Sequence, residues 1–156
     1  MRASIDKKTG DLILPEAKVQ SIIISFLKRF RVDFNRVNGA QFTIAGKNKR
    51  GNSSTRVVRC NSMKGKADIE IWGHAQKDNI QIPIVLYVEV KKSKGGVQSA
   101  HQKDFEKMIE SHGGYYAVIR SLDELLTFLG EVDKDISSKL SGFRLKLGKY
   151  DIISTS

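Results

Sequence analysis

The sequence of 156 residues has few of the side chains that bind zinc or form disulfides. It contains one cysteine, Cys60, and three histidines, His74, His101 and His112. A single cysteine excludes an internal disulfide and a multi-cysteine zinc site. The histidine spacing matches no metalloprotease or zinc finger, and it disfavours an HNH-type nuclease. The sequence therefore predicts neither a structural nor a catalytic zinc ion.

Long apolar runs are also missing. No segment approaches the roughly 18 consecutive apolar residues of a membrane-spanning helix, and the N-terminus lacks the apolar core of a secretory signal. There is no G-x-G-x-x-G and no P-loop, which disfavours a dinucleotide enzyme and a P-loop nucleotide site. With 40% hydrophobic and 28% charged residues, the composition predicts one folded domain. We expect an intracellular protein, in the cytoplasm or on the nucleoid, without a membrane partner.

Acidic residues are absent from one long stretch, residues 34–67. The whole chain carries a net charge of +10, and a basic domain gains affinity for polyanions by displacing their counterions. A solubilising surface would account for excess charge but not for the lack of any acid over this stretch. Nucleic acid is therefore the expected partner. The cations of this stretch are Arg36, Lys47, Lys49, Arg50, Arg56, Arg59, Lys64 and Lys66.

The periodicity of apolar residues predicts an α/β protein. Residues 1–14 form an N-terminal hairpin extension, residues 15–130 the core, and residues 131–156 an accessory segment of the same domain. In the core we expect a helix from Pro15, strands near 31–34, 37–44, 55–60, 67–73 and 84–91, a helix from Ser99, a strand at 115–120 and a helix at 121–129. In the last segment we expect a short helix at 133–140 and a strand at 143–147.

Residues 46–54 read as a basic loop between strands. Its cations, Lys47, Lys49 and Arg50, could contact DNA phosphates without reading sequence. The same composition would suit an idle hairpin tip.

The strand at 84–91 ends in Glu89-Val90-Lys91, and the preceding strand begins beside Asp68. Because strand side chains alternate between faces, Glu89 and Lys91 should point the same way. Two carboxylates and a lysine on neighbouring strands would suit a divalent cation and an activated water. Taken alone, however, the pattern favours a strand that emerges into solvent with an exposed basic edge at Lys91, Lys92 and Lys94.

Two further side chains have two interpretations each, and a third is an alternative ligand. Glu16, in the first turn of a helix, suits the helix dipole, but it also belongs to the inward stripe and could reach the sheet edge. Gln102 completes a capping box with Ser99, and it also starts the inward face of its helix. Glu70 shares a face with Asp68 and could replace it as a ligand.

The order of these segments resembles the PD-(D/E)XK nucleases, and more specifically the virus-type replication and repair nuclease domain, VRR-NUC. The resemblance covers residues 15–129 and rests on their joint order, although Ala67 stands where the family has proline. It implies a restriction-endonuclease-like core, a central mixed four-stranded sheet flanked by helices in the order αβββαβ plus a C-terminal helix. The matching residues are Glu16, 36–39, 65–68, 89–91, 99–102 and 113–118.

The resemblance also implies a site. Asp68, Glu89, the Val90 carbonyl and Glu16 would bind Mg²⁺ or Mn²⁺, Lys91 would orient or deprotonate the attacking water, and Gln102 would support them. The expected activity is a metal-dependent DNA endonuclease, with Holliday junctions or other branched DNA as candidate substrates. Cutting two strands together favours a homodimer. The expected DNA contacts are Arg36, Lys47, Lys49, Arg50, Lys66, Lys92 and Lys94.

The alternatives belong to other classes. A basic nucleic-acid-binding protein could use the same fold without cutting, although it would not need Asp68, Glu89, Lys91 and Gln102 together. An RNA-binding protein of the kind that stacks bases on strand aromatics is disfavoured, since the sequence lacks that strand pattern.

Overall fold

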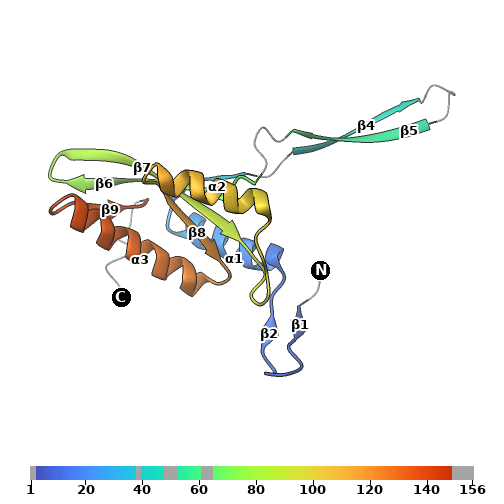
Figure 1. Cartoon of the computed structure of the whole chain (residues 1–156), viewed down its shortest axis with the longest axis horizontal. Coiled ribbons are helices and arrows are strands. Elements are labelled where there is room, and N and C mark those ends of the chain that lie inside the picture. Colours follow the sequence, from blue (N-terminus) through green and yellow to red (C-terminus); the bar gives the residue numbers. More distant parts are fainter. Residues whose placement is uncertain (1–2, 38–39, 48–52, 61–64, 149–156) are drawn as a thin grey trace.

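In the computed structural model, the described residues 3–37, 40–47, 53–60 and 65–148 form a mixed α/β structure, with residues 40–47 and 53–60 described as backbone. A five-stranded sheet is flanked by α1 (Glu16–Arg29), α2 (Ala100–Ser111) and α3 (Leu122–Lys139) (Figure 1). The expectation of a mixed sheet flanked by helices is confirmed at this level. Among the described helices, none is both long and apolar enough to cross a membrane.

The sheet has the order β3 (Asp33–Arg36), β6 (Ile69–Lys77), β7 (Ile80–Val90), β8 (Tyr115–Ile119). β6 is antiparallel to both β3 and β7, whereas β7 and β8 are parallel. β9 (Arg144–Lys146) pairs with β6 beside β3, so the expected count of four strands is one too low. The extra strand comes from the C-terminal segment, which the sequence interpretation kept outside the core.

Because side chains alternate along the strands, each face of the sheet has its own hydrophobic core. Ile71 and Leu86 point to the face that α1 and α3 cover, and they are fully buried. Tyr87 points to the other face, where it packs against Phe105 of α2 and Tyr116 of β8 joins the cluster. Asp68 and Glu89, the candidate metal ligands, fall on this second face, and Glu89 contacts Gln102 of α2.

Two hairpins extend the core. β1 (Ser4–Ile5) and β2 (Leu12–Ile13) form the expected N-terminal hairpin. Leu14 and Ser93 then exchange hydrogen bonds, which ties it to the loop after β7. β4 (Ala40–Lys47) pairs with β5 (Ser53–Cys60) over eight residues each. These two strands form a separate sheet that extends away from the rest of the chain (Figure 1), rather than joining the central sheet.

The C-terminal helix is longer than expected. α3 runs without a break through Gly130, so the separate helices expected at 121–129 and 133–140 are one helix, and the boundary drawn after residue 130 falls inside it. The helix continues because its apolar residues keep their spacing across the glycine, with Leu125, Leu129, Val132 and Ile136 all buried.

Asp133 links α3 to the fifth strand. Its carboxylate accepts hydrogen bonds from Arg144 Nε, at 3.1 and 2.9 Å, and from the Leu145 backbone N–H, at 2.7 Å. Burial raises the pKa of Asp133, but these hydrogen bonds and the positive charges of Arg144 and Lys146 outweigh it, so the pKa is lowered. The ionised carboxylate therefore ties β9 to α3.

We expect Asp133→Ala to lower the free energy of unfolding by about 1 to 3 kcal/mol, because it removes the carboxylate that accepts hydrogen bonds from the Leu145 N–H and from Arg144 Nε. Since the folded-state pKa is lowered, the contribution is present above the ordinary carboxyl pKa and is lost as the pH falls through the folded value. Urea unfolding at pH 7 and pH 3 should therefore show a smaller mutational effect at pH 3. Lys134→Ala, at an exposed neighbouring position, is the control; an equal loss there would contradict the assignment.

Candidate metal and nucleic-acid site

The end of β7 carries the two charged residues of the Glu89-Val90-Lys91 motif inside the protein. Glu89 is 1% exposed and Lys91 is 7% exposed. The interpretation of this segment as a strand emerging into solvent is therefore wrong. A buried carboxylate and ammonium each lose several kcal/mol of hydration, so their partners decide whether the arrangement is tolerable.

The side chains of Glu89, Lys91 and Gln102 all contact one another. Lys91 Nζ lies 2.5 Å from Glu89 Oε1 and 3.1 Å from Gln102 Oε1. Gln102 Nε2 also donates to Glu89 Oε1. As the alternation of strand residues predicted, Glu89 and Lys91 point the same way, toward the N-terminus of α2.

Gln102 fills both roles that the sequence left open. Its Oε1 accepts from the Ser99 backbone N–H at 2.8 Å, while the Ser99 hydroxyl accepts from the Gln102 N–H, which completes the capping box. The same amide contacts Glu89 and Lys91. The helix cap therefore also fixes the orientation of the amide that supports the site.

Asp68 lies beside Glu89, on the neighbouring chain segment before β6. Its Oδ2 accepts a hydrogen bond from the Val90 N–H at 2.8 Å. Gly65, with φ of 81°, lets this segment approach α2: a Cβ there would lie 2.1 Å from the His101 carbonyl oxygen. Burial raises the pKa of Asp68, the Val90 hydrogen bond opposes it, and the negative charge of Glu16 raises it further.

One oxygen of this cluster, Glu89 Oε2, is buried and has no hydrogen-bond partner among the residues that the structure describes. Burial, against the opposing hydrogen bond from Lys91, raises the pKa of Glu89 to about 7, and the charges of Asp68 and Glu16 add to the rise. Such an oxygen beside a second carboxylate favours a bound cation, which would satisfy the lone pair and offset the repulsion.

The structure distinguishes the two candidate metal ligands, Glu70 on β6 and Asp68 just before this strand. Glu70 accepts from Asn35 Nδ2 at 3.0 Å and pairs with Lys66 Nζ at 2.8 Å. Its oxygens are thus used within the fold, and Asp68 is the acid next to Glu89. Glu16 is exposed in the first turn of α1, where its charge acts on both Asp68 and Glu89.

The expected DNA contacts have different surroundings. Lys92 is exposed, whereas Arg36 donates to Gln20 Oε1 at 2.8 Å and Lys94 pairs with Asp6 of the N-terminal hairpin. Lys66 pairs with Glu70, as described above. Lys47 ends β4, where the structure describes the backbone, and Lys49 and Arg50 lie outside the described residues.

The sequence interpretation missed Gly96 as part of the site. A Cβ at this position would lie 2.7 Å from Cβ of Lys91 and 3.3 Å from the Lys92 backbone nitrogen. The loop therefore folds back against Lys91 and excludes water from its stem. The Gly95-Gly96 pair directly after the basic strand end was a usable signal, since adjacent glycines often mark a close backbone approach.

The donor set decides which metal the site could hold. Within the part of the chain that the structure describes, no three His, Cys, Asp or Glu side chains form a metal-binding group. Two carboxylates, Asp68 and Glu89, together with the Val90 carbonyl are oxygen donors. They fit Mg²⁺ or Mn²⁺, since Mg²⁺ keeps several waters and is usually bound through one or two carboxylates and substrate phosphate.

The comparisons with known proteins give no family. No family model, curated protein or solved structure matches the chain. The basis for a proposed function is therefore the geometry of the site, above all the buried Glu89 oxygen that has no hydrogen-bond partner among the described residues.

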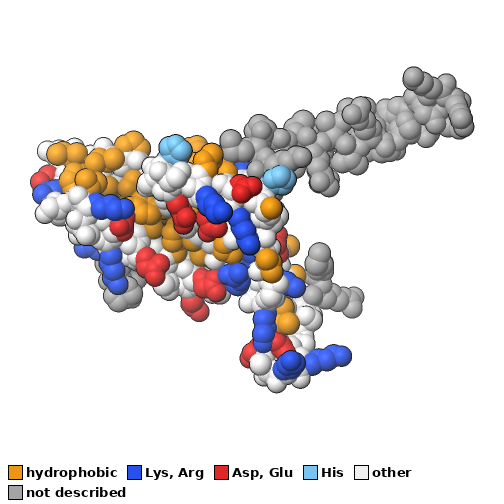
Figure 2. Space-filling model, in the orientation of Figure 1, with side chains coloured by type: hydrophobic (Ala, Val, Ile, Leu, Met, Phe, Trp, Pro, Cys, Tyr) orange, Lys and Arg blue, Asp and Glu red, His pale blue; other side chains and the backbone are white. Residues whose placement is uncertain are grey.

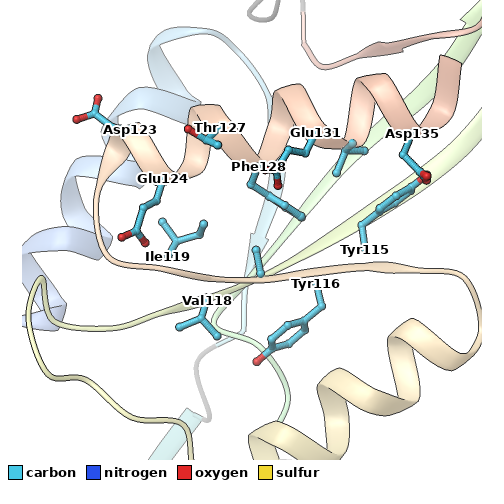
Figure 3. A pocket seen from close by; sticks show the side chains of 12 residues that line it. Tyr115, Tyr116, Val118, Ile119, Asp123, Glu124, Thr127, Phe128, Glu131 and Asp135 are labelled. Atoms are coloured by element: carbon cyan, nitrogen blue, oxygen red, sulfur yellow. The ribbon is translucent and has the colours of Figure 1, made fainter. Parts of the chain in front are cut away.

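A cavity of about 660 Å³ lies elsewhere, between β8 and α3 (Figure 3). Tyr115 and Ile119 line one wall, and α3 contributes Asp123, Glu131 and Asp135 to the other. Tyr115 donates to Asp135 at 2.8 Å across the cavity. Its carboxylates would repel phosphate groups, so this hollow is unsuited to a nucleic-acid backbone.

Proposed function

We propose that the chain is a metal-dependent DNA endonuclease with a restriction-endonuclease-like core, of the PD-(D/E)XK and VRR-NUC type. The observation that carries this proposal is the buried Oε2 of Glu89, which has no hydrogen-bond partner among the described residues. Lys91 and Gln102 contact the other oxygen of the same carboxylate, and the negative charge of Asp68 acts on it. A purely structural ion pair would be expected to use both carboxylate oxygens. Here one carboxylate oxygen stays open to a bound cation.

In this proposal Asp68, Glu89 and the Val90 carbonyl hold Mg²⁺ or Mn²⁺, and Glu16 contributes through water. The bound metal would lower the pKa of a water molecule and offset the charge that builds on the scissile phosphate. Lys91 orients the attacking water and adds positive charge beside the phosphate. Gln102 fixes Lys91 and Glu89, because it contacts both and is itself fixed by the cap of α2.

The net charge of +10 supplies the affinity for DNA in this proposal. We propose that the β4–β5 hairpin reaches along the DNA, since it extends from the body of the protein and carries basic residues at its end (Figure 1). Branched DNA such as a Holliday junction is the proposed substrate class, and a homodimer would present two sites to two strands.

Neutralising Lys47, Lys49 and Arg50 together to glutamine should weaken DNA binding and lower the slope of log K against log salt by up to about 3, since each phosphate contact contributes roughly one. Titrations by fluorescence anisotropy at several salt concentrations measure this slope. Neutralising Lys28, Lys107 and Lys134, which are exposed, removes the same charge elsewhere and is the control. Equal slopes in the two variants would show that the loop makes no specific contribution.

The deciding experiment for the proposed function is cleavage of a labelled four-way junction and of a linear duplex with the same sequences, in Mg²⁺ and in EDTA. Cutting of the junction alone, in Mg²⁺ only, is the expected result. Cutting of both would mean a nuclease without structure selectivity. Tight binding without cutting would contradict the nuclease proposal and favour the basic, non-catalytic binding protein.

A further inference from the structure

Trp72 is the single tryptophan of the chain, and it lies on β6 with 52% of its surface exposed. β6 has neighbours on both sides at this point, because Trp72 is opposite Asp33 of β3 and Val85 of β7. A large aromatic side chain in such a position is normally covered by a helix. Here Val85 beside it is also exposed, at 38%.

The exposed indole shares a sheet face with the candidate metal site. Asp68, Glu70 and Trp72 alternate onto one face, the same face on which Tyr87 packs under Phe105 of α2. Helix α2 covers Tyr87 and leaves Trp72 and Val85 uncovered. Figure 2 shows hydrophobic side chains gathered over the β6–β7 hairpin, beyond the end of α2. Trp72 is four residue steps along the chain from Asp68, which is about 13 Å in a strand.

The residues around Trp72 favour a planar ligand that carries negative charge. A hollow of about 470 Å³ is lined by Trp72, Arg31, Asp33, His74 and Lys146, among others. Lys146 is the cross-strand partner of His74, the next residue on this face of β6. An aromatic face with two cations beside it suits a planar base attached to a phosphate backbone, and the Asp33 carboxylate can accept from an exocyclic amino group.

We propose that Trp72 stacks an unpaired nucleobase of the DNA whose backbone passes the Asp68–Glu89 site. That the bound polymer is DNA rests on the proposed function. The bases of an intact duplex are already stacked on one another, so only an unpaired or extruded base can offer its face to the indole. The preferred substrate class is therefore DNA with unpaired nucleotides close to the cut, such as a flap, a gap or an open branch point.

The charges argue for a nucleic acid at this surface rather than a second copy of the chain. A symmetric contact through Trp72 would bring Arg31 and Lys146 of both copies together, with one carboxylate, Asp33, from each. Like charges opposed at an interface are costly, whereas DNA phosphates would neutralise them. Trp72 is a positioning residue in this proposal, because it touches the substrate away from the reacting phosphate.

The test uses the intrinsic fluorescence of the full chain, since all of its indole emission comes from Trp72. In EDTA, where no cutting occurs, a flapped oligonucleotide is expected to quench this emission, and a blunt duplex of equal length is not. Trp72→Ala should weaken binding of the flap by about tenfold or more and leave binding of the duplex unchanged. Trp72→Phe should keep most of the preference, and Leu126→Ala, which truncates an exposed apolar side chain on α3, is the matched control.

Three results would overturn the stacking proposal: equal quenching by duplex and flap, an unchanged preference in Trp72→Ala, or an emission change on concentrating the protein without DNA, which would indicate self-association through Trp72. These outcomes are separate from the nuclease question. Quenching by the flap without cutting in Mg²⁺ would contradict the nuclease proposal alone. Cutting with the same flap preference in wild type and Trp72→Ala would contradict stacking alone.

Discussion

Replacing Lys91 with methionine is expected to lower the rate of DNA cleavage by about 100- to 1,000-fold, the usual cost of removing one preorganised charge from a reaction site. Methionine keeps most of the apolar stem that packs against Gly96, so the loss should come from the ammonium group. Single-turnover cleavage at saturating Mg²⁺ measures the rate, and thermal melting checks that the fold survives.

The matched control for Lys91 is Lys107→Met, which removes an exposed lysine from α2 and should leave the cleavage rate within about twofold, as is usual for surface changes away from the site. DNA binding in EDTA should be nearly the same in both variants, because Lys91 is only 7% exposed and contributes little to the surface charge. A Lys91→Met protein that is folded and cuts at the wild-type rate would contradict the proposed mechanism.

Glu89→Gln should lower stability in two ways. With Mg²⁺ at about 100 times its Kd, binding to the folded state stabilises the wild type by about 2.7 kcal/mol, or about 5–10 °C in Tm. The variant should lose this gain, because an amide is a poor ligand for Mg²⁺. In EDTA at pH 8 the variant should also melt below the wild type, since it leaves the buried Lys91 ammonium without its carboxylate partner.

Glu70→Gln is the control that distinguishes the two acids facing the same way. Glu70 is engaged by Lys66 and Asn35, so its replacement should leave the Mg²⁺-dependent rise in Tm intact and lower the Tm slightly in EDTA. Differential scanning calorimetry of the wild type and both variants, with and without Mg²⁺, measures all six Tm values. A Mg²⁺ effect that survives Glu89→Gln and disappears in Glu70→Gln would move the metal site to Glu70.

The sequence could predict the parts of the site that depend on local pattern. Strand alternation placed Glu89 and Lys91 on one face, and the capping box placed Gln102 at the start of α2, where its amide reaches both. Neither pattern could show that the strand end is buried. That property comes from Gly96 and α2, which fold over Lys91 from later in the chain.

Other features depended on pairings that local sequence does not determine. β9 joins the sheet because Asp133 of α3 binds Arg144 and the Leu145 N–H, a contact that no periodicity signals. Glu70 and Asp68 have equivalent positions in a strand pattern, and only the position of Lys66 and Asn35 separates them. The exposure of Trp72 likewise depends on where α2 ends its cover of the sheet.

The β4–β5 hairpin pairs within itself over eight residues per strand, and its two-stranded sheet is separate from the five-stranded one. Its length is therefore free to change in evolution without disturbing the chemistry. Two residues added to each strand would lengthen it by about 7 Å and keep every side chain on its original face. Related chains could in this way extend their hairpins to different distances from the same candidate metal site.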